Sequence, residues 1–233
     1  MRAIESAKNE ATIQMHITLL LKNVLDENSG YTRVIDQAFT ALPDNLGFNN
    51  GLATPQPGMA EGLMAGEFMP FPIDDQLGGV AVFIKDEDDS ITLPHLAAEF
   101  KGPGKDMLQA RIQSAYDGAA LVYARNQALK YIGKPDPRGH ATITTFTSDG
   151  TSVCFFAHYA DQSETDGKIK YHQYSLGTTS LTDSYDAWTK ARRQLRNVQE
   201  DARNRSYDLR DQLVDYWNAE SGSAGETSVS DLD

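Results

Sequence analysis

Cysteine is nearly absent from this chain. Its one cysteine, Cys154, excludes an intramolecular disulfide and any zinc site built from cysteines. No apolar run approaches the length of a membrane span, and the first residues, MRAIESAKNEA, lack the apolar centre of a signal peptide. We therefore expect a protein without a membrane segment that works inside the cell, in the cytoplasm or the nucleus.

Basic residues are also scarce. The 21 Lys and Arg face 33 Asp and Glu, which gives a formal net charge of −12. This balance argues against indiscriminate binding to nucleic acid, because affinity for phosphate comes mainly from Lys and Arg. It leaves room for a local basic surface and for a metal-dependent nuclease, whose carboxylates are themselves negative.

Apolar side chains recur at helical spacing in three long segments. The pattern predicts helices at residues 4–27, 106–132 and 184–217. The sequences NSG and GKP that follow the first two are helix-stop signals. Residues 31–42 are predicted to form a shorter helix that ends before a proline.

Short apolar runs between turn signals predict the strands. They lie at residues 80–85, 91–101, 141–147, 153–159 and 168–175. The acidic turn KDEDD joins the first two as a hairpin, and the turns SDG and TDG connect the other three as an antiparallel meander. Residues 43–72 are rich in Gly, Pro and Asn, and we expect a long loop there with one short strand.

The order of these elements indicates the fold class. Helix, hairpin, helix, antiparallel strands and helix are typical of an α/β fold with a central mixed β-sheet flanked by helices. Residues 1–217 are long enough for one domain. Residues 218–233 are rich in Ser, Gly and acids, and they are predicted to be a disordered acidic tail.

The stretch LPHLAAEFKGPGKDMLQARIQSAY, residues 93–116, holds the candidate site. Side chains alternate along a strand, so Glu99 and Lys101 share one face at its end. Burying both charges is costly unless each has a partner or a function. A second acid-x-lysine triplet, residues 166–168, lies in a turn. Only the first precedes a helix at a strand end, where sites gather in α/β sheets, although a structural ion pair would fit the spacing equally.

The predicted hairpin supplies a second carboxylate. If residues 80–85 pair with residues 91–101 about the acidic turn, Asp75 lies opposite Lys101, and a slip of one residue exchanges it for Asp74. Either register brings a carboxylate towards Glu99. The alternative is that both aspartates are loop or helix-cap residues.

Two carboxylates beside a lysine are the minimum for metal-assisted phosphodiester hydrolysis. Mg²⁺, or Mn²⁺ in its place, binds one or two carboxylates together with waters and substrate phosphate oxygens. Glu99 and Asp75 would be the metal ligands, and Lys101 the catalytic cation. Gly104 and Lys105 lead into a helix N-terminus suited to a backbone phosphate, and Gln113 lies on a helix face that can line the same cleft.

These residues carry a family resemblance. The strand-terminal Glu99-x-Lys101, the preceding hairpin and the following helix with Gln113 resemble the PD-(D/E)XK, or restriction-endonuclease-like, nuclease superfamily. The sequence LPHLAAEFKGPGKDMLQARIQSAYDGAALVYARNQAL is similar to a fungal nuclease-like domain of uncharacterised function placed in that superfamily. The resemblance implies a restriction-endonuclease-like core, Mg²⁺-dependent cleavage of DNA or RNA, and Glu99, Lys101 and Gln113 as the catalytic residues.

The chain departs from the superfamily at one position. The Pro-Asp of the family falls on Pro57-Gly58, where the aspartate is missing, and Glu61 points to the opposite strand face. If no other carboxylate reaches Glu99, the chain is a nuclease fold kept for binding nucleic acid or a protein. The two functions carried forward are therefore an active nuclease and a catalytically inactive module.

The remaining charged and imidazole side chains suggest no further site. The histidines show no metal-ligand spacing, and His95, on the Glu99 face, lies either in the packed interior or at the edge of the cleft. The arginines of the last helix interleave with acids, which favours a solvated, salt-bridged face over a nucleic-acid groove.

Overall fold

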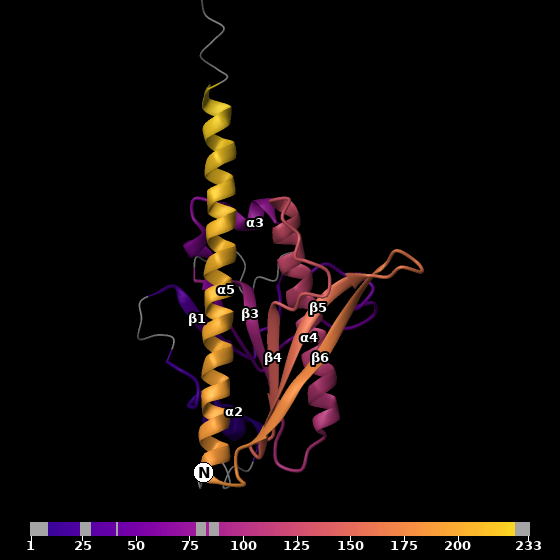
Figure 1. Ribbon diagram of the computed structural model, residues 1–233, viewed down its shortest axis with the longest axis vertical. Coiled ribbons are helices and arrows are strands. Elements are labelled where there is room, and N and C mark those ends of the chain that lie inside the picture. The colour runs from indigo at the N-terminus through magenta and orange to yellow at the C-terminus, as the bar shows by residue number, and fades with distance from the viewer. Residues whose placement is uncertain (1–8, 24–28, 41, 78–82, 84–88, 227–233) are drawn as a thin grey trace, which may run out of the picture.

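One mixed sheet of six strands organises the molecule, and its spatial order, β1-β2-β3-β4-β5-β6, is also the order in sequence (Figure 1). The computed structural model describes residues 9–23, 29–40, 42–77, 83 and 89–226. All neighbouring strands are antiparallel except β3 and β4, which are parallel. The predicted α/β fold with a central mixed sheet flanked by helices is confirmed. The strands are β1 (Tyr31–Ile35), β2 (Met59–Met64), β3 (Ile91–Phe100), β4 (Ile143–Ser148), β5 (Ser152–Gln162) and β6 (Ile169–Ser180).

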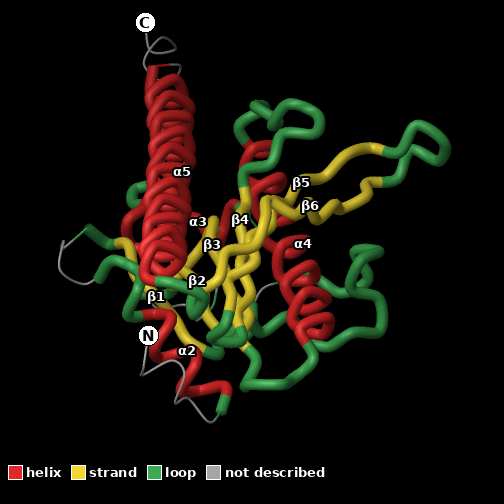
Figure 2. The backbone as a smooth tube through the Cα atoms, turned by 60° about the horizontal axis from the view of Figure 1, so that its bottom comes forward, coloured by secondary structure: helices red, strands yellow, loops and turns green. Residues whose placement is uncertain are grey.

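Helices cover both faces of the sheet. The crossover helix α4 (Met107–Tyr131) connects the parallel strands β3 and β4 on one face. The other face is covered by α2 (Glu10–Thr18) and the first half of α5 (Tyr185–Glu226), as Figure 2 shows. Two short helices, η2 (Ala65–Phe68) and α3 (Ile73–Gln76), precede β3. No helix within the described residues is both long and apolar enough to cross a membrane.

Alternation along β3 divides the core between the two faces. All ten residues of β3 are buried. Leu96, Ala98 and Phe100 pack with Ile13 and other side chains of α2 and α5 in one hydrophobic cluster. Ala97 belongs to a second cluster that includes the apolar side of α4. The side chains of β3 that alternate with Leu96, Ala98 and Phe100 therefore face α4, and Glu99 is one of them.

The long central helix and the meander agree with their predictions. Asp106 caps α4, because its carboxylate accepts the main-chain N–H of Leu108 at 2.8 Å. Strands β4, β5 and β6 form the expected antiparallel meander. The last helix is longer than expected. Residues 218–226 continue α5 to Glu226, so the prediction of disorder from residue 218 is wrong for them. Residues 227–233 lie outside the described part.

The N-terminal helix is shorter than its apolar stripe suggests. Ile13, Ile17, Leu20 and Leu21 are all buried, as the spacing predicts, but α2 ends at Thr18. The main chain beyond it is used for contacts with α5. Arg196 Nε donates to the carbonyl of Leu20 at 3.1 Å, which a continuing helix would have used internally. Residues 4–8 and 24–27 of the predicted helix lie outside the described part.

Residues 31–42 were expected to be helical, and that prediction is wrong. Residues 31–35 form β1, which pairs with β2 at the edge of the sheet, Tyr31 opposite Leu63 and Val34 opposite Ala60. Thr32, Val34 and their neighbour at position 35 are β-branched and favour strand over helix. Pairing with a distant strand outweighed the short helical pattern.

The partner of β3 also differs from expectation. Its antiparallel neighbour is β2, with Met59 opposite Ala98 and Met64 opposite Ile91. Of the predicted strand at residues 80–85, only Phe83 is described, a buried residue whose N–H donates to the Ile91 carbonyl at 3.1 Å. The hairpin register that placed Asp75 opposite Lys101 is therefore wrong.

Buried histidines make stability depend on pH. His158 is fully covered, and its Nε2 lies 2.7 Å from Thr145 Oγ1, which lies 2.6 Å from Ser114 Oγ on α4. Gly118 permits this approach, since a Cβ there would fall 2.1 Å from His158 Nδ1. Burial lowers the pKa of His158 from 6.5 to about 4. His158 therefore binds a proton less readily in the folded state than in the unfolded chain.

We expect the free energy of unfolding of the wild type to lose a contribution as the pH falls from 6.5 towards 4. The folded pKa lies below the unfolded one, so the stabilisation is complete above pH 6.5 and shrinks by about 1.4 kcal/mol per unit below it. Urea unfolding of wild type and His158→Gln at several pH values measures this difference. A difference between the two that is independent of pH would contradict the prediction.

Candidate functional site

The end of β3 brings three charged side chains together. Glu99 and Lys101 are 3% and 7% exposed, and the Lys101 ammonium lies 3.9 Å from Glu99 Oε2. The same ammonium lies 3.7 Å from Glu10 Oε1 at the start of α2. The Glu10 side chain is 55% exposed, so the cluster reaches solvent on the α2 side. Glu99 and Lys101 therefore do share a face, as the strand alternation predicts.

A second carboxylate reaches Glu99 from α4. Asp117 lies near the middle of this helix, is 2% exposed, and forms a side-chain hydrogen bond with Glu99. Burial and the Glu99 charge raise the pKa of Asp117 well above its usual value. Burial also raises the pKa of Glu99 to about 7, although the Asp117 hydrogen bond and Lys101 oppose the rise. The pair therefore holds a proton, which Asp117 donates to Glu99.

Several oxygen atoms in this region have no hydrogen-bond partner. They are Glu99 Oε1, Asp117 Oδ2 and Gln113 Oε1, all buried. Gln113 and Asp117 are one turn apart on the same face of α4. Buried acceptors without donors are rare because each costs free energy, and a cation would satisfy them. The proton shared by Glu99 and Asp117 meets part of this need, and a bound cation is an alternative way to meet it.

The donor set fits Mg²⁺ or Mn²⁺. Across the described residues no group of three or more His, Cys, Asp or Glu is arranged to hold a metal. The candidate ligands are thus two carboxylates, Glu99 and Asp117, and Gln113 lies one turn before Asp117 on α4. Mg²⁺ typically takes one or two carboxylates and keeps several waters, so two are sufficient.

Gly58, where the resemblance to the nuclease superfamily would place an aspartate, lies beside Glu99. Because Met59 pairs with Ala98, Gly58 is the next residue of β2 towards Glu99, and its N–H donates to the Glu99 carboxylate. A Cβ at Gly58 would fall 3.0 Å from the Phe100 ring and 3.3 Å from the Ala98 carbonyl oxygen. An aspartate would therefore force a shift, and the carboxylate that does reach Glu99, that of Asp117, comes from α4 instead.

The structure does not bring Asp75 to Glu99. Asp74 and Asp75 lie in α3, whose Gln76 accepts a hydrogen bond from the Tyr131 hydroxyl at 3.2 Å. Tyr131 is the last residue of α4, about 21 Å along the helix from Asp117 at about 1.5 Å per residue. The prediction that Asp75 shares a metal with Glu99 is wrong, because it depended on the incorrect hairpin register.

The loop between β3 and α4 lies at the edge of the cluster. Gly102 lies against the start of α2, since a Cβ there would be 3.3 Å from the Glu10 main-chain nitrogen. Gly104 has a φ of 72°, which favours glycine, and Lys105 is exposed. The Asp106 carboxylate already occupies one free N–H of the helix. Phosphate binding by Gly104 and Lys105 stays a prediction.

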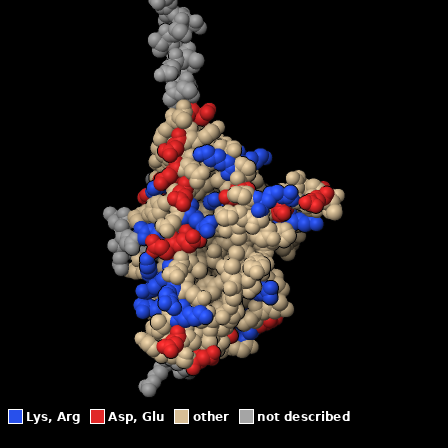
Figure 3. Space-filling view, in the orientation of Figure 1, with Lys and Arg blue, Asp and Glu red and all other residues tan. Residues whose placement is uncertain are grey.

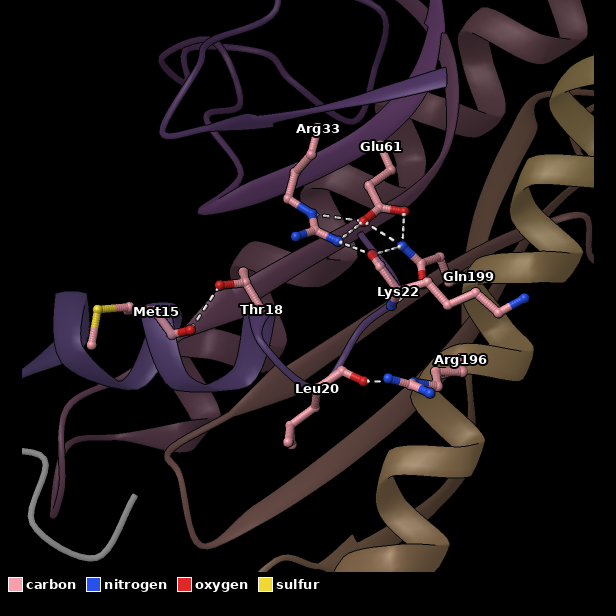
Figure 4. Close-up of polar contacts among 8 residues, drawn as sticks. All are labelled: Met15, Thr18, Leu20, Lys22, Arg33, Glu61, Arg196 and Gln199. Carbon is pink, nitrogen blue, oxygen red and sulfur yellow. Dashed lines mark hydrogen bonds and ion pairs between the residues drawn. The ribbon is translucent and has the colours of Figure 1, made fainter. Parts of the chain in front are cut away.

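Glu61 is a structural residue on the other sheet face. It is completely buried and accepts hydrogen bonds from Arg33 Nε at 2.7 Å and from the Gln199 amide at 2.9 and 3.0 Å (Figure 4). Burial raises its pKa, which the Arg33 charge opposes. The same Gln199 amide donates to the Lys22 carbonyl at 3.2 Å, so the cluster joins the segment after α2 to α5.

His95 is packed in the interior rather than at the cleft edge. Its Nδ1 lies 3.0 Å from Ser206 Oγ and its Nε2 lies 2.9 Å from the Arg125 guanidinium. Since Arg125 can only donate, Nε2 accepts and the ring proton is on Nδ1. Burial and the Arg125 charge lower the pKa of His95 well below its usual value. The histidine is a neutral link between helices.

Sequence reasoning missed two members of the cluster, Asp117 and Glu10. Asp117 stands alone among small and apolar residues in the sequence AYDGAALV, four residues after Gln113. An acid on the buried side of a helix, one turn from a candidate site residue, is a detectable signal. Glu10 is one of several acids near the N-terminus, and no pattern singles it out.

Comparisons with known proteins place the chain in a family without adding an activity. No curated protein matches it, and no solved structure matches it. A family model described as "Domain of unknown function (DUF7924)" matches residues 3–208, most of the chain and all of the cluster around Glu99. The chain belongs to this family, the Domain of unknown function (DUF7924).

Proposed function

We propose that the protein is a metal-dependent nuclease of the PD-(D/E)XK type that hydrolyses phosphodiester bonds of nucleic acid. The observation that carries the proposal is the convergence of Glu99, Asp117 and Lys101 at the end of β3. A second carboxylate within hydrogen-bond reach of Glu99 replaces the aspartate missing at Gly58.

Each side chain has a role that its position supports. Glu99 and Asp117 would hold Mg²⁺ or Mn²⁺, and this ion supplies an activated water and offsets the charge that develops on phosphorus. Lys101 is a donor fixed between Glu99 and Glu10, suited to orient the attacking water or to stabilise that charge. Gln113 contributes an amide oxygen from the neighbouring turn of α4.

The topology supports a restriction-endonuclease-like core. Strands β1, β2 and β3 form an antiparallel meander, α4 crosses over, and β4 returns parallel to β3. The candidate residues lie at the end of β3 and on the crossover helix. Nucleic acid, DNA or RNA, is the proposed substrate.

A catalytically inactive module that keeps this fold and binds nucleic acid or a protein is the second candidate. Two observations favour it: Glu99, Lys101 and Asp117 are each less than a tenth exposed, and Gly58 stands where the superfamily has its aspartate. A metal ion and a phosphate can enter only if the Glu99–Asp117 pair loses its proton. The side of the cluster next to α2 must also open.

The decisive experiment incubates the protein with labelled DNA and RNA in Mg²⁺, in Mn²⁺ and in EDTA. We expect cleavage with metal, none in EDTA, and a loss of about a thousandfold in Glu99→Gln and in Lys101→Ala, because each removes a group that acts on the reacting phosphate. The control Glu164→Gln removes a carboxylate from an exposed turn and should cleave as the wild type does.

Two results would contradict the nuclease. Cleavage that persists in both site variants would show that another group or a contaminant is responsible. A wild type that binds substrate but cleaves neither nucleic acid with either metal would favour the inactive module.

A further inference from the structure

One part of α5 is basic although the whole chain is strongly acidic. Residues 187–199, sequence AWTKARRQLRNVQ, contain no Asp or Glu and four cations. These are Lys190, Arg192, Arg193 and Arg196, here called the α5 basic segment. The sequence pattern alone suggested interleaved charges along the whole helix, and this is true only further along it.

The α5 basic segment presents its charge to solvent. Ala191 and Leu195 are buried and fix the helix on the sheet, whereas Lys190 and Arg193 are exposed. In the described part of the chain no ion pair joins any of the four cations to a carboxylate. Figure 3 shows Lys and Arg side chains gathered over the lower half of α5, with acidic side chains along its upper half. Within the described residues, no carboxylate neutralises this positive charge through an ion pair.

The nearest carboxylates on α5 do not change this. Asp186 lies in the first turn, before the segment, where it complements the helix dipole. Glu200 follows the segment and forms an ion pair with Lys22. The net charge of the α5 basic segment therefore stays positive.

Aromatic rings continue the surface at the start of α5. Tyr185, 72% exposed, stacks on Trp188 with ring centroids 6.0 Å apart and planes at 27°. The Arg192 guanidinium lies 5.6 Å from the Trp188 ring centroid on the next turn. The three side chains form a stacked column whose outermost ring, Tyr185, is open. A flat exposed ring beside unpaired cations is the arrangement on which an unpaired base stacks.

A groove borders the segment on the sheet side. It measures about 320 Å³ and lies between α5 and the β5–β6 strands, with Lys190, Gln194 and Asn197 on one wall and Thr178 and Leu176 on the other. Amides and a hydroxyl beside an ammonium can hydrogen-bond phosphate and sugar oxygens. The groove places these polar groups along the flank of α5 that carries Lys190.

We propose that the α5 basic segment and Tyr185 form a binding surface for single-stranded nucleic acid. The cations contact successive phosphates and Tyr185 stacks on one base. The segment rises about 9 Å from Lys190 to Arg196. The surface lies on the sheet face opposite α4 and Asp117. The inference rests on the proposed function only in identifying this strand with the substrate; the binding itself needs no metal.

The test measures fluorescence anisotropy of a labelled single-stranded oligonucleotide with the whole protein in EDTA. Four phosphate contacts predict a slope of log K against log salt of about −2.8, at about −0.7 for each contact. In the double variant Lys190→Glu with Arg193→Glu we expect affinity to fall at least about tenfold and the slope to approach about −1.4. Tyr185→Ala should weaken binding by about tenfold without changing the slope, because stacking releases no counterion.

The matched control is Lys168→Glu with Lys170→Glu, two exposed lysines at the β5–β6 hairpin. Both double variants change the formal net charge by −4, from −12 to −16. The control should bind within about twofold of the wild type. An equal loss in the control would overturn the proposal, because it would show a bulk charge effect. Failure of the wild type to bind, or binding of anionic lipid vesicles in place of the oligonucleotide, would overturn it as well.

The outcome also separates this surface from the nuclease proposal. Glu164→Gln, in an exposed turn outside both sites, should bind the oligonucleotide as the wild type does. A wild type that binds through α5 but never cleaves supports the surface and contradicts the nuclease. Cleavage by a double variant Lys190→Glu with Arg193→Glu at the wild-type rate and affinity would contradict the surface and leave the nuclease standing.

Discussion

Asp117→Asn should abolish cleavage and at the same time make the protein more stable. The substitution removes one of the two carboxylates that would hold the metal, so we expect a loss of activity of about a thousandfold. It also removes a buried carboxyl group whose ionised form is opposed by burial and by the Glu99 charge. The Asn amide can still donate to Glu99. We expect a gain of about 1–3 kcal/mol near neutral pH, measured by urea unfolding beside the cleavage assay.

Opposite changes in activity and stability identify a functional residue. A side chain kept for packing would lose stability when replaced, whereas a ligand kept for metal binding is a stability cost to the folded state. Asp215→Asn, at an exposed position of α5, is the matched control and should change neither quantity. If Asp117→Asn were destabilised and kept full activity, the pair with Glu99 would be structural and the proposed metal site would be wrong.

Arg33→Ala should have the largest effect on folding. It leaves Glu61, which is completely buried, with only the Gln199 amide as a charge-stabilising partner. Breaking a buried ion pair by removing one member typically costs about 3–5 kcal/mol, because an uncompensated charge stays in the interior. Urea unfolding measures the loss. Arg205→Ala, which breaks an exposed pair with Asp201 on α5, should cost less than about 1 kcal/mol.

A double substitution tests whether the uncompensated charge of Glu61 causes the loss of stability in Arg33→Ala. Replacing Arg33 and Glu61 together by leucine removes both charges, so most of the loss should be recovered even though the Gln199 amide then keeps only its bond to the Lys22 carbonyl. A double variant as unstable as Arg33→Ala would show that the side-chain packing of these residues, and not the unpaired charge, determines the effect.

Local patterns predicted the parts of the fold that local physics determines. Helix α4 was predictable because its cap and its stop signal lie within the segment, and the alternation of β3 correctly placed Glu99 beside Lys101. The end of α2 was not predictable, since Thr18 is the last helical residue only because the main chain beyond it binds α5. That contact joins residues far apart in sequence.

Pairing between distant strands explains the larger errors. Strand β2 is only six residues long and lies in a Gly- and Pro-rich region, so nothing in its sequence identified it as the partner of β3. The acidic turn suggested a nearer partner, and that choice led to Asp75 as the second carboxylate. Asp117 comes from α4, and its burial depends on how closely this helix approaches the end of β3. Local spacing does not encode that distance.

The contacts between the segment after α2 and α5 constrain the time at which the protein can fold during synthesis. The Lys22 N–H donates to Gln199 Oε1 at 2.8 Å, and the Gln199 amide covers Glu61. Until residue 199 has left the ribosome, the nascent chain lacks the cover that α5 provides on one sheet face, and the Glu61 carboxylate lacks its amide donor. Glu61 must stay hydrated until then. The sheet face that α5 covers therefore closes only after α5 has been synthesised, and a nascent chain that ends before α5 presents apolar strands to chaperones rather than a finished domain.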